Sequence, residues 1–170
     1  TVAKTKFTKA YGDKAFEIDA ETEEDVEITF ASSDKKVVTV NADGKVSIKG
    51  CGTANITVKT VEDNMYASAK KTIKITVKPK KNSFTQASSK KKAQASLKWK
   101  KDSKASGYEI VYTYNGKSKK VDVKKNSTTS TTIKSLKSKK TYSVKIRSYK
   151  KVNGEKIYGD YSKVKKITVK

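Results

Sequence analysis

The sequence contains no histidine, only one cysteine, and a single arginine, Arg147, among its 40 basic residues. Without histidine the chain lacks the usual general base at neutral pH and the commonest zinc ligand. As the sole cysteine, Cys51 cannot form an internal disulfide, and because Gly50 and Gly52 flank it we interpret it as a small packed residue. Nucleophile elbows, phosphate-binding loops and metal-ligand clusters are missing too. We therefore predict a protein that is not an enzyme and that needs no cofactor or metal.

Long apolar runs are missing as well. No stretch approaches the ~20 apolar residues of a membrane span, and the sequence has no signal-peptide core. The chain begins with Thr1 rather than methionine, so we interpret it as an excerpt from a longer protein, whose address signals can lie outside it.

Lysine is abundant, and it is unevenly distributed. Residues 1–78 hold 13 basic and 12 acidic side chains, a net charge of +1, whereas residues 79–170 hold 27 basic and 5 acidic side chains, a net charge of +22. This asymmetry predicts two modules with different surfaces and an anionic partner for the second. The lysines are spread over every segment of the second module, which favours a solvated coat. Because lysine lacks the fork of arginine, we expect non-specific adhesion to polyanions and no sequence-specific nucleic-acid binding.

Alternation of apolar and polar residues runs through both parts of the chain, although an apolar fraction of 34% and a net charge of +23 alone would favour disorder. A period of two predicts half-buried β-strands, which need apolar residues only at every second position. The single proline, Pro79, follows such a run at residues 72–77 and ends it, because proline cannot donate to a sheet. We therefore predict an all-β protein of two tandem β-sandwiches, residues 1–78 and residues 79–170.

In the first module, apolar residues alternate on both sides of Asp43-Gly44, a pair that tolerates the positive φ of a tight hairpin turn. Further segments along the module are Tyr11-Gly12-Asp13, Ser32-Ser33-Asp34, Val37-Val38-Thr39-Val40, Gly44-Lys45-Val46, Gly50-Cys51-Gly52-Thr53-Ala54 and Ile73-Lys74-Ile75-Thr76-Val77. On these residues the module resembles the bacterial immunoglobulin-like domains of group 2. That family usually has a small residue at the position of Cys51, which supports the interpretation of this thiol as a packed residue.

An acidic stretch lies between residues 17 and 27 of the first module. Carboxylates can hold Ca²⁺, but the stretch lacks the spacing of glycine and Asp or Asn in an EF-hand loop. We interpret it as a solvated loop between strands, with electrostatic docking against basic residues as the alternative.

The second module carries Trp99 in an alternating run, the segment Gly107-Tyr108-Glu109-Ile110, and Leu136 six residues before Tyr142. On these residues it resembles a fibronectin type III domain. The resemblance implies a tyrosine corner at Leu136 and Tyr142, in which the phenol hydroxyl bonds back to the chain. An Arg-Gly-Asp tripeptide is absent from residues 149–162, so integrin binding by that route is not expected.

The hairpin at residues 150–159 is the candidate contact site, because in type III domains the loop before the last strand often grips partners. In the preceding strand, alternation places Val144 and Ile146 on one face and Lys145 and Arg147 on the other. The predicted partner-binding residues are Lys145, Arg147, Lys150, Lys151, Asn153, Lys156 and Tyr158.

Five tyrosines offer an alternative contact, an aromatic strip. Tyr108, Ile110 and Tyr112 alternate onto one face, however, so most of the five are expected in the core. The five are Tyr112, Tyr114, Tyr149, Tyr158 and Tyr161.

The two resemblances imply spacing, display or adhesion at the surface of a Gram-positive bacterium, and no chemistry. The expected partner is an anionic cell-wall polymer such as wall teichoic acid, an anionic glycan, or a host protein, and the expected form is an extracellular monomer. Two alternatives remain open: a module that binds polyanions or nucleic acid through the lysine-rich second domain, and accessory domains of a larger surface enzyme. An isopeptide bond, as in some Gram-positive surface domains, would need a buried lysine beside Asn or Asp.

Overall fold

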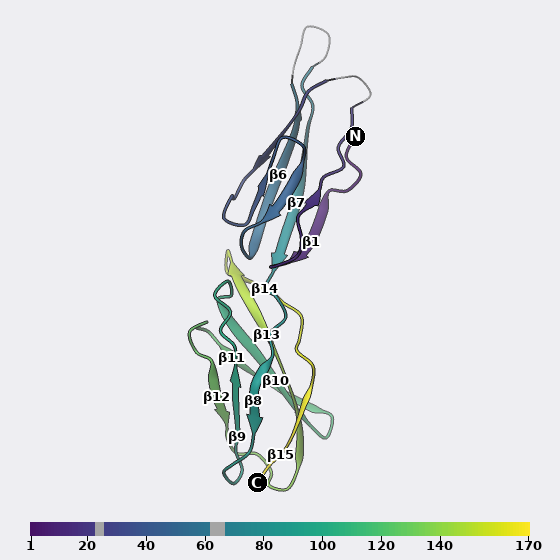
Figure 1. The fold of residues 1–170 in the computed structure, drawn as a ribbon. Helices are drawn as coiled ribbons and strands as arrows, with labels where there is room; N and C mark the ends of the chain where they lie inside the picture. The colour runs from purple at the N-terminus through teal and green to yellow at the C-terminus, as the bar shows by residue number, and fades with distance from the viewer. Residues whose placement is uncertain (23–25, 62–66) are drawn as a thin grey trace. The chain divides into compact units, whose positions relative to one another are not determined.

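The computed structural model describes residues 1–22, 26–61 and 67–170. Part of the acidic stretch, residues 23–25, therefore lies outside the described residues. The chain divides into two compact units, Thr1–Lys78 and Pro79–Lys170, and each unit has its own apolar core. Throughout the described part of the chain, all regular elements are β-strands (Figure 1). The prediction of an all-β fold is confirmed.

The first unit is a sandwich of two sheets. The larger sheet has the order β1 (Lys6–Ala10), β7 (Lys70–Lys78), β6 (Gly52–Thr60) and β3 (Ile28–Ser32), with β1 parallel to β7 and the other neighbours antiparallel. The smaller sheet has the order β2 (Phe16–Glu17), β5 (Lys45–Ile48) and β4 (Val38–Val40). Alternate residues of β6 and β7 are buried, including Ile56, Ile73 and Ile75. One face of the larger sheet therefore packs against the smaller sheet, and the core of the unit lies between them.

The hairpin predicted in this unit is formed by β4 and β5, with Val40 opposite Val46. Its loop is longer than a two-residue turn, since the main-chain N–H of Gly44 donates to the carbonyl of Asn41 at 3.1 Å. Of the Asp43-Gly44 pair only Gly44 has a positive φ, 75°. The pair thus supplies one left-handed residue rather than two.

The second unit is also a sandwich of two sheets. One sheet has the order β11 (Lys117–Val123), β10 (Gly107–Tyr114), β13 (Thr141–Val152) and β14 (Glu155–Tyr158), and β15 (Lys165–Thr168) pairs with the first part of β13. The other has the order β12 (Ser130–Ile133), β9 (Ala95–Trp99) and β8 (Phe84–Ser88). Trp99, Tyr108 and Ile146 are buried between them. The long strand β13 therefore carries two partners along one edge, and the hairpin to β14 is an extension of the sheet.

A tyrosine corner fixes one end of the second core. The main-chain N–H of Lys137 donates to the hydroxyl of Tyr142 at 3.1 Å, and both Leu136 and Tyr142 are buried. The tyrosine corner predicted from the spacing of Leu136 and Tyr142 is therefore present.

Replacing Tyr142 with phenylalanine should destabilise the second unit by about 1 kcal/mol, because the N–H of Lys137 loses its acceptor. The expected fall in the midpoint of its thermal transition is about 5 °C. Fluorescence of Trp99, the only tryptophan, reports on this unit selectively. Tyr114→Phe is the matched control, because its hydroxyl makes no hydrogen bond with a described residue; an equal loss in both variants would contradict the role of the corner.

Candidate functional site

The candidate site is the side of the five-stranded sheet that faces away from the core. The register places Glu109 opposite Arg147 and Tyr149 opposite Tyr158. These pairs point outward, because the alternate residues Ile146 and Ser148 of the same strand are fully buried. We call this surface the cation–tyrosine face. Its charged and aromatic members are Glu109, Lys120, Asp122, Lys145, Arg147, Tyr149, Lys151, Lys156, Tyr158 and, after β14, Tyr161.

Arg147 lies at the centre of the cation–tyrosine face and is fixed by several contacts. Its Nε donates to Oε1 of Glu109 at 2.8 Å, and its Nη2 lies 2.7 Å from the same oxygen. Its guanidinium carbon lies 3.6 Å from the ring centre of Tyr158 and 4.3 Å from that of Tyr161. The ammonium of Lys145 lies 4.2 Å from the Tyr161 ring centre. Cation–π contacts thus hold the two rings and the two cations in one arrangement.

Glu109 anchors this arrangement, and with 6% of its surface exposed it is buried despite facing outward. Besides Arg147, it accepts a hydrogen bond from the hydroxyl of Tyr161 and lies 3.5 Å from the ammonium of Lys120. Burial alone would raise the pKa of Glu109, but the hydrogen bonds from Tyr161 and Arg147 outweigh it, and the pKa is lowered. Burial and the hydrogen bond to Glu109 raise the pKa of Tyr161 to about 12. Glu109 is therefore ionised and Tyr161 neutral at neutral pH.

A second cluster on the same face centres on Lys156. Its ammonium lies 2.8 Å from Oδ2 of Asp122 and 4.1 Å from the ring centre of Tyr149. Burial would lower the pKa of Lys156, but the hydrogen bond and charge of Asp122 outweigh it and the pKa is raised. The ring of Tyr149 packs against Gly107: a Cβ atom added at position 107 would lie 2.6 Å from the phenol oxygen of Tyr149. Glycine at position 107 therefore lets Tyr149 lie flat against the sheet.

The structure brings together four of the seven predicted partner-binding residues: Lys145, Arg147, Lys156 and Tyr158. Lys151 lies on the same face, opposite Lys156 in the register. Lys150 points to the other side of the strand, and Asn153 occupies the turn between β13 and β14 with φ of 48°. A role in binding stays a prediction for all seven.

Two acidic members of the face, Glu109 and Asp122, were missed by sequence reasoning. Glu109 and Asp122 are two of only five acidic residues in the second unit, and both lie in alternating strands at outward positions. Because acidic residues are so rare in this unit, their outward positions could have indicated pairing with the cations of the same face. Their pairing with Arg147 and Lys156 depends on the register between strands, which a single sequence does not give.

The five candidate tyrosines divide between two sides of the sheet. Tyr112 and Tyr114 pack on the core side, with ring centres 6.4 Å and 5.0 Å from that of Tyr142. The expectation of a core position holds for these two. Tyr149 and Tyr158, whose ring centres are 5.9 Å apart, belong with Tyr161 to the cation–tyrosine face, so an aromatic strip does exist there.

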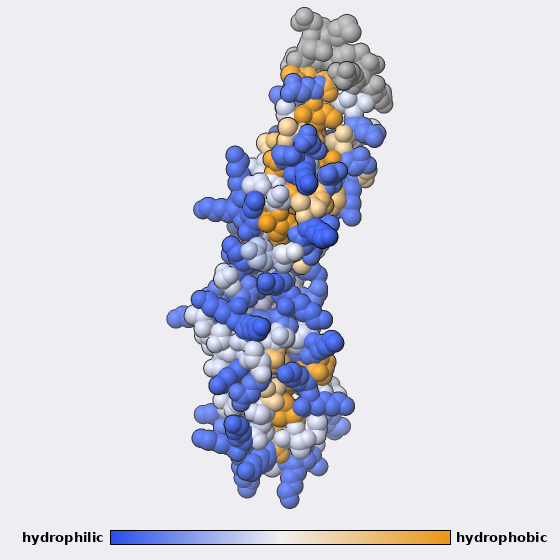
Figure 2. Space-filling view, viewed as in Figure 1, coloured by the Kyte–Doolittle hydropathy of each residue, from blue (hydrophilic) through white to orange (hydrophobic). Residues whose placement is uncertain are grey.

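Lysines coat the second unit beyond this face. Figure 2 shows hydrophilic residues over most of the visible surface of residues 79–170. No lysine is buried anywhere in the described part of the chain, so the buried lysine that an isopeptide bond requires does not occur there.

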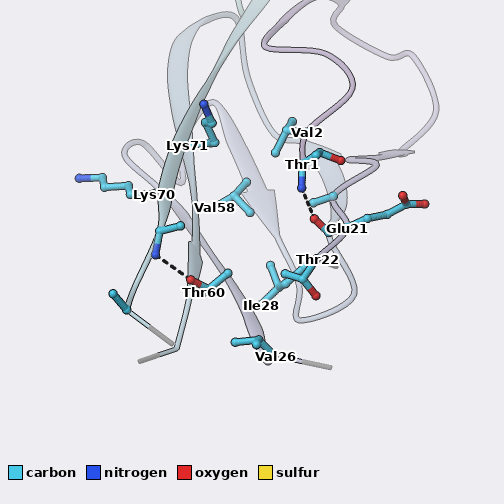
Figure 3. A pocket seen from close by; sticks show the side chains of 13 residues that line it. Thr1, Val2, Glu21, Thr22, Val26, Ile28, Val58, Thr60, Lys70 and Lys71 are labelled. Carbon is cyan, nitrogen blue, oxygen red and sulfur yellow. Dashed lines mark hydrogen bonds between the residues drawn. The ribbon is translucent and has the colours of Figure 1, made fainter. Parts of the chain in front are cut away.

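A hollow of about 400 Å³ lies near Thr1 at one end of the first unit (Figure 3). Its walls are mainly apolar and include Val2, Ile28 and Val58, and the charged side chains of Glu21, Lys70 and Lys71 also line it. Within residues 1–22, 26–61 and 67–170, no three potential metal ligands of the His, Cys, Asp and Glu types lie together. In those same ranges no helix is long and apolar enough to cross a membrane.

Comparison with known families agrees with the geometry of both units. Residues 77–162, half of the chain, match the fibronectin type III domain, and the chain belongs to this family. Residues 25–61 match the family described as intimin, immunoglobulin-like domain. An immunoglobulin-like domain followed by a fibronectin type III domain is thereby confirmed. No curated protein matches the chain.

Solved structures with a similar fold include three that contain fibronectin type III domains. A two-domain segment of chicken tenascin has a TM-score of 0.59 at 16% identity, over 84% of this chain and 82% of that one. The FN1–FN3 domains of chicken CNTN1 have a TM-score of 0.48 at 18% identity, over 76% of this chain. The match covers 47% of the CNTN1 chain, about half of its length. A fibronectin type III domain from human KIAA0970 has a TM-score of 0.41 at 21% identity, over 52% of this chain and 72% of that one. Of these, the tenascin likeness supports the fold.

Replacing Glu109 with glutamine should destabilise the second unit by about 2 kcal/mol at neutral pH, because charge-assisted hydrogen bonds to Arg147 are lost. The pKa of Glu109 is lowered by folding. Its contribution is therefore full above the usual carboxyl pKa of about 4.3 and is lost as the pH falls through the lowered value. The wild-type protein should lose this stability in acid, and the variant should not. Denaturation at several pH values, followed by the fluorescence of Trp99, measures the difference. Glu155→Gln, at an exposed residue, is the control, and a matching change there would contradict the assignment.

Proposed function

We propose that this chain is a non-catalytic pair of structural and adhesion modules from an extracellular surface protein of a Gram-positive bacterium. Immunoglobulin-like and fibronectin type III domains commonly serve as structural or adhesion modules and are typical of extracellular or surface proteins. The proposed partner is an anionic cell-wall polymer or glycan, or a host protein that presents acidic side chains, bound by a monomer.

The observation that carries this proposal is the fixed geometry of Arg147, Tyr158 and Tyr161. Tyrosine and arginine dominate the energetics of many interfaces, because they offer large contact areas with few rotatable bonds. Here the ion pair with Glu109 and the cation–π contacts hold the side chains before any partner arrives. Binding then loses little side-chain entropy at this surface.

A second candidate function is non-specific binding of polyanions or nucleic acid by the whole second domain. Its net charge of +22 and the exposure of its lysines favour this alternative. Such binding is governed by counterion release and therefore falls steeply with salt. Attachment through the cation–tyrosine face would instead keep part of its strength at high salt, because aromatic contacts are not screened.

Attachment of the chain to isolated cell walls and to host-protein arrays tests the proposal. Lys145→Gln with Lys151→Gln should weaken attachment by about tenfold, a loss of about 1.4 kcal/mol. The control, Lys98→Gln with Lys134→Gln, makes the same charge change on the other side of the domain and should stay within about twofold.

Tyr158→Ser separates the aromatic contribution from charge. It should weaken attachment that persists at about 0.5 M salt, where exposed charges are screened. Equal losses in the lysine variant and its control, with no effect of Tyr158→Ser, would favour non-specific polyanion binding instead.

A further inference from the structure

The immunoglobulin-like domain has a net charge near zero, yet its larger sheet carries lysines in directly opposed pairs. The antiparallel register of β6 and β7 places Lys59 opposite Lys70, and the parallel register of β1 and β7 places Lys6 opposite Lys74. All four side chains are exposed and point away from the core. The three strands lie side by side in Figure 1.

Rows of threonine separate these lysine pairs on the same face. Thr57 lies opposite Thr72, between the two lysine pairs along β7, and Thr53 lies opposite Thr76 beyond them. Successive outward positions on a strand are about 7 Å apart, so the lysine rows are about 13 Å apart with a hydroxyl row between them. We call the outward side of β1, β7, β6 and β3 the lysine–threonine face.

Acidic side chains are excluded from this part of the sheet. The strands β1, β3, β6 and β7 contain no Asp or Glu at any position. Glu27, one residue before β3, is the described carboxylate that comes nearest to them in sequence. None of the four lysines forms an ion pair with a carboxylate in the described part of the chain. Like charges directly opposite one another destabilise a sheet, and here no described counter-charge offsets the repulsion.

Aromatic and guanidinium groups are also missing from the outward positions of β1, β3, β6 and β7, all of which are described. Nucleic-acid bases are recognised by stacking on aromatic side chains, and bidentate anion recognition uses arginine. Lysine instead acts as a point charge, and threonine hydroxyls both donate and accept hydrogen bonds. The face therefore suits a flexible chain that has single negative charges at intervals and hydroxyl groups between them.

We propose that the lysine–threonine face binds a linear phosphodiester polyol, with phosphates at the lysine rows and polyol hydroxyls at the threonine rows. Each phosphate would stand between two opposed ammonium groups and relieve their repulsion. The surface lies in the first domain, so its failure would leave the proposed contact face of the second domain untouched.

The test is a titration of the whole 170-residue chain with poly(glycerol phosphate), followed by NMR at the amides and methyls of Thr57 and Thr72. This residue-level readout separates the first domain from the strongly cationic second one. We expect saturable shifts at both threonines. Lys59→Gln, Lys70→Gln and Lys74→Gln together should weaken this binding by about a hundredfold, about fivefold for each ammonium near an anionic polymer.

The matched control is Lys35→Gln with Lys45→Gln and Lys49→Gln, which removes the same charge from the same domain outside this face. It should change the affinity by no more than about twofold. Lys59→Glu is a second variant that replaces the like-charged pair with an opposite pair, so it should fold at least as stably and still lose binding.

Three results would overturn the proposal: no shifts at Thr57 and Thr72 at saturating polymer, equal weakening in the triple variant and its control, or retained binding in a folded Lys59→Glu protein. Single-stranded DNA and heparin of equal charge should shift these threonines more weakly. Equal affinity for either polymer would also overturn the assignment of a polyol.

Discussion

The two-residue period of a β-strand is the constraint on which both domains depend. A strand in a sandwich gives every second side chain to the core, as Ile56 and Ile73 do in the first domain and Ile110 and Ile146 do in the second. Every described lysine keeps contact with solvent, because an ammonium group is costly to bury without a partner. A net charge of +23 is thus compatible with folding, since water and salt screen charges that lie on the outer faces.

Glu109 is the point at which the second domain departs from this division. It points outward yet is buried, because Arg147, Tyr161 and Lys120 surround its carboxylate. Removing a charge from water is costly, and the hydrogen bonds from Arg147 and Tyr161 offset that cost. The same contacts hold Tyr158 and Tyr161 in place around the arginine. Stability and the shape of the candidate surface therefore depend on one ion pair.

Local patterns of the sequence predicted local structure, and contacts between distant segments decided the rest. The tyrosine corner was predictable because Leu136 and Tyr142 lie six residues apart and lead into one strand. The strands β1 and β8 were missed, since their short, partly polar sequences show little alternation and their places depend on pairing with β7 and β9. Arg147 and Glu109 are 38 residues apart, and only the register of β10 with β13 joins them.

Net charge is a poor guide to where an anionic partner would bind either domain. The near-neutral first domain gathers directly opposed lysines on one sheet face, whereas the second spreads lysines over many strands and loops and pairs its arginine with Glu109. The long-range electrostatic field of lysines that are spread over a whole domain speeds the approach of any anion, but it discriminates little between one anion and another. Discrimination between partners depends instead on the side chains that lie between the cations. Tyrosine rings favour partners with flat faces, and threonine hydroxyls favour partners that carry hydroxyls, so the two faces would discriminate between different polymers.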